Sequence, residues 1–236
     1  MTPLAEHAAA LFNLELSAEH EAAFARYADE LLVWNERINL TAITDPDGVM
    51  IRHFLDSLTL MKVLELRPGL RVIDVGSGAG FPGLPLQIAY PQFAMTLLEA
   101  TGKKVSFLQH MIDTLKLPNV QALKGRAEEI GQMQAHRATY DVAVARAVAR
   151  LPILLEYLMP LVQVGGVCIA MKGKTAHSEV ESSRHALTIL GGRLDRIEAF
   201  QLPGVEETHY LVMVEKTAPT PTQYPRRSGL PSQQPL

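Results

Sequence analysis

The sequence of 236 residues predicts an α/β fold, in which a doubly wound, mostly parallel sheet carries helices on both faces. Three observations predict it. Short β-rich runs alternate with amphipathic stretches in the middle of the chain, a glycine-rich segment follows the first run, and the last two runs have no helix between them. Strands that alternate with helices form parallel sheets, whereas strands joined by a short turn pair antiparallel.

Residues 1–68 predict a helical extension that precedes the sheet. Ser17 is a suitable N-cap, and apolar residues then recur at helical spacing from Phe24 to Leu32. A second helix is predicted over residues 47–64, because its apolar side chains share one face and Pro68-Gly69 follow it.

Residues 69–216 predict the main domain. Its buried strands are predicted at residues 72–75, 95–98, 120–123, 140–145 and 167–171, and its clearest helix at residues 103–117. Two further strands, 193–202 and 208–216, are joined by Pro203-Gly204-Val205 and should pair antiparallel. The tail, residues 217–236, is rich in Pro, Ser, Thr and Gln, a composition that predicts disorder.

Composition excludes several classes of protein. Hydrophobic residues make up 47% of the chain, yet no apolar run approaches the roughly 20 residues of a membrane span. The N-terminus lacks the pattern of a signal peptide, and Cys168 is the single cysteine, so we expect a cytoplasmic protein without membrane partners. The net charge of −3 argues against nucleic-acid binding by bulk charge, although basic pairs such as Lys103-Lys104 allow a local site.

The strongest local signal is the glycine segment, residues 74–83, with the sequence Asp-Val-Gly-Ser-Gly-Ala-Gly-Phe-Pro-Gly. Glycines let the backbone turn sharply and approach a ligand closely. Gly78, Gly80 and Gly83 match the dinucleotide fingerprint, which seats a pyrophosphate on a helix N-terminus. Gly76, Gly78 and Gly80, preceded by Asp74, match instead the first motif of S-adenosylmethionine-dependent methyltransferases.

Two features favour the methyltransferase interpretation. The Asp74 carboxylate suits a cationic ligand and would repel a pyrophosphate. The antiparallel pair of strands at the end of the chain matches the seventh-strand hairpin of class I methyltransferases. A nicotinamide-dependent oxidoreductase, a small-molecule methyltransferase and a ribosome-binding assembly factor with a vestigial pocket remain as alternatives.

Two further carboxylates follow predicted strands. Glu99 ends the second strand, where an acidic side chain typically accepts ribose hydroxyls; the alternative is a solvated carboxylate at a strand end. Ala127 and Glu128 follow the third strand and can flank an adenine, although they also fit an ordinary exposed helix start.

Additional motifs occur in order along the chain: Asn39-Leu40-Thr41-Ala42-Ile43, His53-Phe54-Leu55-Asp56-Ser57-Leu58, the glycine segment, Lys103-Lys104, Arg126-Ala127-Glu128, Ala145-Arg146-Ala147-Val148-Ala149, Gly165-Gly166 and Lys172-Gly173. In this combination the sequence resembles the family of ribosomal RNA small-subunit methyltransferase G, also called glucose-inhibited division protein B. The resemblance runs from about residue 34 to residue 216. The tail segment Tyr224-Pro225-Arg226-Arg227 resembles one found in part of the family.

The resemblance implies a class I methyltransferase with a seven-stranded sheet and S-adenosylmethionine as methyl donor, which leaves as S-adenosylhomocysteine. It implies methylation of N7 of guanine 527 in 16S ribosomal RNA. It also implies cofactor contacts at Gly76, Phe81, Ala127-Glu128 and Arg146. One departure is Thr208, where many relatives carry Arg, so no role is transferred to that position.

Guanine N7 carries a free lone pair at neutral pH, so its methylation needs alignment and no general base. Alignment can contribute up to about 7–11 kcal/mol in well-oriented systems. Arg146 is therefore expected to position the substrate or shape the cofactor site; the alternative is a structural ion pair, for example with Asp74. Cys168 lies in an apolar strand and is predicted to be a core residue, and no metal site is predicted.

The partner expected for a monomeric enzyme of this kind is 16S ribosomal RNA or the small ribosomal subunit. Phosphate contacts set the register of a protein on RNA. The alternatives are solvated charges for the basic residues, a core position for His53 and an anchoring role for Tyr224. The candidate RNA contacts are Arg52, His53, Lys103, Lys172, Tyr224, Arg226 and Arg227.

Overall fold

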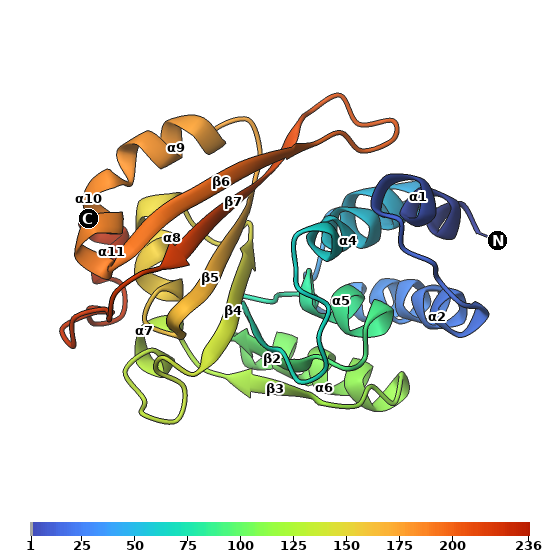
Figure 1. The fold of residues 1–236 in the computed structure, drawn as a ribbon. Coiled ribbons are helices and arrows are strands. Elements are labelled where there is room, and N and C mark those ends of the chain that lie inside the picture. The colour runs from blue at the N-terminus through green and yellow to red at the C-terminus, as the bar shows by residue number, and fades with distance from the viewer. Residues whose placement is uncertain (1) are drawn as a thin grey trace.

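The computed structural model describes residues 2–236 and contains a seven-stranded sheet of order β3-β2-β1-β4-β5-β7-β6 (Figure 1). Strand β7 is antiparallel to both of its neighbours, and the other neighbouring strands are parallel. This confirms the predicted sheet and its terminal hairpin. The strands are β1 Arg71–Val75, β2 Ala94–Glu99, β3 Val120–Lys124, β4 Tyr140–Arg146, β5 Val162–Lys172, β6 Gly192–Phe200 and β7 His209–Lys216.

Helices cover both faces of the sheet, and each face has its own apolar core (Figure 1). One core joins the sheet to the N-terminal helices and to α5 Gly83–Ala89 and α6 Gly102–Thr114. The other joins it to helices from the second half of the domain. These are α7 Ala127–Ile130, α8 Leu151–Leu158, α9 Ala176–Ser182 and α10 Arg184–Leu190.

The N-terminal extension begins with α1 Pro3–Phe12 and α2 Ala18–Asn35. The Ser17 hydroxyl accepts a hydrogen bond from the His20 N–H, which confirms the predicted N-cap. The second predicted helix is not uniform. It consists of α3 Pro46–Gly48, a π-helical turn η1 Val49–Leu55, α4 Asp56–Leu58 and a 3₁₀ turn η2 Thr59–Lys62.

The tail packs against the domain, so the disorder predicted from its composition is wrong. The Arg137 guanidinium donates to the backbone carbonyls of Thr220, Pro221 and Tyr224, and the Tyr224 side chain is buried in the second core. Composition missed this because a few buried anchors fix a segment that is otherwise polar. The tail ends in a short helix, α11 Leu230–Gln233. The described helices include none long and apolar enough to cross a membrane.

Candidate active site

The glycine segment turns sharply between β1 and α5. Gly76 has φ +74°, and a Cβ built there would lie 2.7 Å from a methyl carbon of Val148. Gly80 has φ +94°, and its Cβ would lie 2.3 Å from Leu84. Both positions therefore need glycine for conformation and for space. The buried Tyr27 hydroxyl donates to the carbonyl of Ala79 and holds the turn from the N-terminal side.

Asp74 fixes the other end of this segment. Its side chain is fully buried, and Oδ2 accepts a hydrogen bond of 3.0 Å from the Gly83 N–H. Oδ1 has no hydrogen-bond partner among residues 2–236. Burial raises the pKa of Asp74 to about 7. A cationic ligand near the loop would favour the charged form of the Asp74 carboxylate.

A cavity of about 250 Å³ opens beside the glycine segment. Glu99 lies on its wall and is 7% exposed, with Oε2 accepting from the Gly78 N–H and Oε1 from the Thr101 N–H. The solvated interpretation of Glu99 is therefore wrong. A helix does start here, with Arg126 and Glu129 exposed, but Ala127 and Glu128 are buried and line the cavity. The cavity is lined by Val75, Gly76, Leu98, Glu99, Ala100, Gly125, Arg126, Ala127, Glu128, Val148, Ala149, Tyr157 and Ser232.

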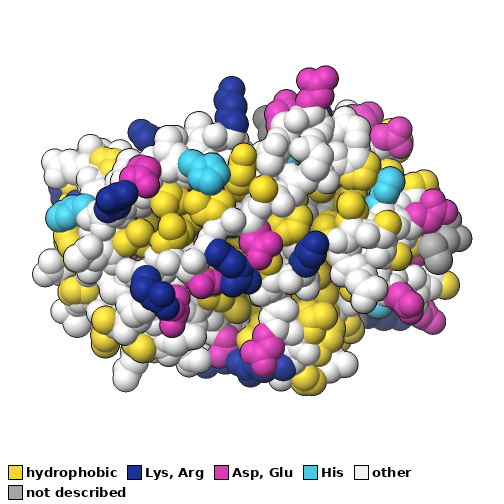
Figure 2. Space-filling view, turned by 45° about the horizontal axis from the view of Figure 1, so that its top comes forward, with side chains coloured by type: hydrophobic (Ala, Val, Ile, Leu, Met, Phe, Trp, Pro, Cys, Tyr) yellow, Lys and Arg dark blue, Asp and Glu magenta, His cyan; other side chains and the backbone are white. Residues whose placement is uncertain are grey.

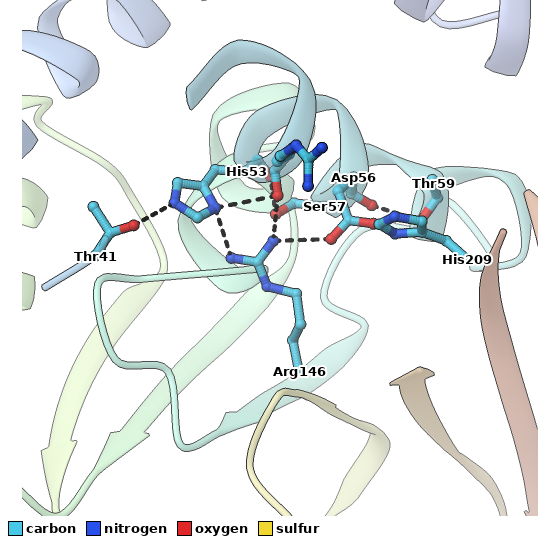
Figure 3. Close-up of polar contacts among 8 residues, drawn as sticks. Thr41, His53, Asp56, Ser57, Thr59, Arg146 and His209 are labelled. Atoms are coloured by element: carbon cyan, nitrogen blue, oxygen red, sulfur yellow. Dashed lines mark hydrogen bonds and ion pairs between the residues drawn. The ribbon is translucent and has the colours of Figure 1, made fainter. Parts of the chain in front are cut away.

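A second cavity, of about 430 Å³, is lined by Arg146 at the end of β4. Arg146 Nη1 donates to Asp56 Oδ2 at 2.9 Å and to the carbonyl of Arg52 at 3.0 Å. Nη2 lies 3.3 Å from His53 Nδ1 (Figure 3). The ion-pair partner of Arg146 is thus Asp56, on α4, in place of Asp74.

Asp56 also binds His209, the first residue of β7. His209 Nδ1 lies 2.8 Å from Asp56 Oδ1, so the two carboxylate oxygens bind two different elements (Figure 3). The hydrogen bond to Asp56 raises the pKa of His209. Burial works to raise the pKa of Asp56, but the His209 hydrogen bond and the Arg146 charge outweigh it and leave that pKa below its ordinary value.

His53 is a neutral member of this cluster. Burial, followed by the neighbouring Arg146 charge, lowers the pKa of His53 to about 4. Nδ1 lies 3.3 Å from Arg146 Nη2 and 3.1 Å from the Arg52 carbonyl oxygen, and Nε2 lies 2.7 Å from the Thr41 hydroxyl oxygen. The imidazole stacks on the Phe81 ring at 4.4 Å between centroids, and the Arg146 guanidinium lies 4.9 Å from the same ring. Phe81 therefore connects the glycine segment to the Arg146 cluster.

The loop after β4 separates the two cavities. Ala147 lines the Arg146 cavity and has φ +57°, an unusual conformation for a residue with a Cβ. Val148 and Ala149 line the cavity beside the glycine segment. Such strained positions cluster at functional sites. Neighbouring residues of one short loop thus line both cavities.

The candidate RNA contacts differ in exposure and in their partners. Arg52, Lys103 and Arg227 are exposed. Lys172 forms an ion pair of 2.8 Å with Glu179, and Arg226 pairs with the buried Glu156. Tyr224 is buried, as its anchoring interpretation expects. Figure 2 shows acidic and basic side chains interspersed on the face that it draws.

Two members of the cluster were missed by sequence reasoning. Asp56 lies within a motif of the resemblance, but no pattern in the sequence showed its contact with Arg146, 90 residues away. His209 follows the divergent Thr208 and meets Asp56 from 153 residues away. Cys168 is buried, and burial raises the pKa of its thiol to about 12, which confirms a core residue. The described residues contain no group of three or more His, Cys, Asp or Glu suited to a metal ion.

Comparisons with known proteins decide the family. The family model described as rRNA small subunit methyltransferase G matches residues 20–209. The chain belongs to this family. The ribosomal RNA small subunit methyltransferase G of Chloroflexus aggregans is 47% identical over 225 residues, which cover 95% of this chain and 94% of the relative. That of Desulforamulus reducens is 40% identical over 236 residues, or 100% of this chain and 98% of the relative.

Solved structures support the same fold. A SAM-dependent methyltransferase from Aquifex aeolicus superimposes with a TM-score of 0.54 at 18% identity, covering 72% of this chain and 93% of that chain. At this identity the likeness concerns the fold alone. Together with the family match, it identifies the sheet as that of a class I methyltransferase and removes the oxidoreductase interpretation.

Proposed function

We propose that this chain transfers the methyl group of S-adenosylmethionine to N7 of a guanine in 16S ribosomal RNA, guanine 527 by resemblance. The observation that carries the proposal is the pair of cavities on either side of residues 147–149, within a chain that belongs to the rRNA small subunit methyltransferase G family. One cavity suits the cofactor and the other suits the acceptor base.

The residues around the smaller cavity fit S-adenosylmethionine. Glu99 would accept the ribose hydroxyls, and Ala127 and Glu128 would flank the adenine, since all three line this cavity. Gly76 gives Val148 its place on the cavity wall, and the open space beside Gly78 would suit the amino acid end of the cofactor. Gly80 and Phe81 fix the path of the loop. The ionised form of the buried Asp74, whose Oδ1 has no hydrogen-bond partner among residues 2–236, would add negative charge near a cationic ligand. When bound, the cofactor would supply an electrophilic methyl group on its sulfonium.

The acceptor cavity needs no general base, because guanine N7 already carries a lone pair. Its task is to align N7 with the methyl carbon and to exclude water. Arg146, fixed by Asp56 and His53, is placed to bind O6 of the guanine or a phosphate. A hydrogen bond from Arg146 to N7 itself would block the reaction, so that contact is excluded from the proposal.

The RNA around the target base is proposed to contact exposed Arg and Lys side chains. Arg52 borders the acceptor cavity, and Lys103 and Arg227 are the other candidates with exposed side chains. Lys172 and Arg226 are held in ion pairs, which suits them to shaping the surface that RNA meets. We further propose that the enzyme acts as a monomer in the cytoplasm, an expectation supported by its single, buried cysteine.

The test uses radiolabelled S-adenosylmethionine with small ribosomal subunits, naked 16S ribosomal RNA and large subunits, all from cells that lack this methylation. We expect label in the small subunit or its RNA and none in the large subunit. Cofactor binding without transfer to either small-subunit substrate would overturn the acceptor assignment. Transfer to small metabolites in the absence of RNA would favour a small-molecule methyltransferase.

A further inference from the structure

The tail crosses from β7 to the cofactor cavity, and ordinary anchors fix its path. In Figure 1 the C-terminal end lies beside the helices of the second half of the domain, and α11 contacts α8. Arg226 Nε lies 2.8 Å from Glu156 Oε1, and Nη2 lies 2.6 Å from Oε2, in a bidentate pair with a fully buried carboxylate. Tyr224 is buried nearby in the second core.

Beyond these anchors, the tail touches the cofactor cavity at two points. The Gly229 N–H donates to Glu128 Oε1 at 3.0 Å, and Glu128 is only 6% exposed. The Ser232 hydroxyl lies 3.2 Å from the Tyr157 hydroxyl, and both residues line the cavity. The tail thus contacts one residue already assigned to the adenine side of the site and completes the wall next to it.

We propose that residues 226–232 form the outer wall of the adenosine pocket, with Gly229 orienting Glu128 and the Ser232–Tyr157 hydroxyl pair facing the base. This inference rests on the proposed cofactor site and extends it to a segment that composition alone predicts to be disordered. Adenine presents an amino donor and ring-nitrogen acceptors, which a carboxylate and two hydroxyls can match. Gly229 is a positioning residue in this arrangement, because it acts through Glu128.

Substitutions at the anchoring residues Tyr224 and Arg226 cannot test the proposal. Removal of the tail, or of Arg226, would leave the Glu156 carboxylate buried without its cation, and a buried unpaired charge destabilises the whole fold. Ser232 offers a cleaner test, because it lines the cavity and is also exposed, so that its replacement leaves no buried group unpaired. Its neighbour Gln233 lies on the same short helix, is exposed and does not line the cavity.

The experiment compares Ser232→Trp with Gln233→Trp in the full chain. Calorimetric titration with S-adenosylmethionine and S-adenosylhomocysteine should show dissociation constants raised by at least about tenfold in Ser232→Trp and by less than about twofold in Gln233→Trp. The Michaelis constant for the cofactor should rise in the same way, while that for the ribosomal substrate stays unchanged. Unfolding midpoints without ligand should match in the two variants.

Equal cofactor affinity in both variants would overturn the proposal, as would a loss of affinity that follows a loss of stability. Failure of the proposed function has a different signature. In that case the unaltered protein itself would bind neither S-adenosylmethionine nor S-adenosylhomocysteine, whatever residue occupies position 232.

Discussion

Arg146 and Asp56 form an ion pair, with 2.9 Å between Nη1 and Oδ2, that joins the end of β4 to the N-terminal extension. Both side chains are largely buried, at 16% and 7% exposure. Asp56 uses its second oxygen for His209 on β7. The Asp56 carboxylate thus joins the N-terminal extension to two strands, and the extension contributes to the cavity around Arg146 as well as to the core.

Replacing Arg146 with Ala should lower the catalytic efficiency by at least about a hundredfold, because both alignment of the guanine and the Asp56 orientation are lost. Breaking a buried pair also costs stability, by about 3 kcal/mol. Methyl transfer and urea denaturation measure the two effects. Arg150→Ala is the control, since Arg150 is an exposed arginine just before α8. Equal activity of the two variants would contradict a positioning role for Arg146.

The positions of the residues proposed to bind the cofactor were predictable from sequence, because they depend on local patterns. Strand ends, the glycine segment and Glu99 all lie where the alternation of strands and helices puts them. The acceptor side was not predictable in the same way. Asp56 and His209 meet only through tertiary packing, and the π-helical turn before Asp56 changes which side chains of the predicted helix face the site.

The ordered structure of the tail was also not predictable from sequence. Its composition predicts disorder, yet the residues that order it lie far away along the chain: Arg137 is 83 to 87 residues from its partners in the tail, and Glu156 is 70 residues from Arg226. Contacts between residues so far apart along the chain leave no recognisable pattern in either stretch of sequence. The boundaries at residues 68 and 216 follow from composition and remain predictions.

Gly76→Ala should weaken S-adenosylmethionine binding by at least about tenfold. A methyl group at φ +74° collides with Val148 and displaces the loop that faces the cofactor. Gly165→Ala is the matched control, because Gly165 has φ +88° but no atom of residues 2–236 lies within 4 Å of its Cβ position. Both variants should lose about 1–2 kcal/mol from backbone strain, and Gly165→Ala should retain full affinity. Similar affinities for the two variants would refute the loop assignment.

Cofactor affinity should depend on pH through Asp74. Burial raises the pKa of Asp74 to about 7, and a cationic ligand binds the ionised form better, so affinity is present above that pH and falls as pH drops through it. Calorimetry between pH 6 and 8, in buffers of different ionisation enthalpy, should detect proton release on binding. In Asp74→Asn both the release and the pH dependence should disappear. Persistence of proton release in that variant would assign the titration to another group.

The His209–Asp56 hydrogen bond should stabilise the fold at low pH. It raises the pKa of His209, so its contribution is fully present below the ordinary value of 6.5 and is lost as pH rises through the folded-state pKa. His209→Gln should therefore be less stable than the unaltered protein at pH 6, with a smaller difference at pH 9. Urea denaturation measures this difference. A His209 imidazole that titrates at or below 6.5 by NMR would rule out the explanation.

The central claim is tested most directly by mapping the methylated base. After reaction with small subunits or 16S ribosomal RNA that lack the modification, the RNA is reduced with borohydride, cleaved with aniline at N7-methylguanine, and read by primer extension. The account predicts one new cleavage, at guanine 527, that depends on S-adenosylmethionine and is lost in Arg146→Ala. Methylation at another atom, or at many guanines, would contradict it.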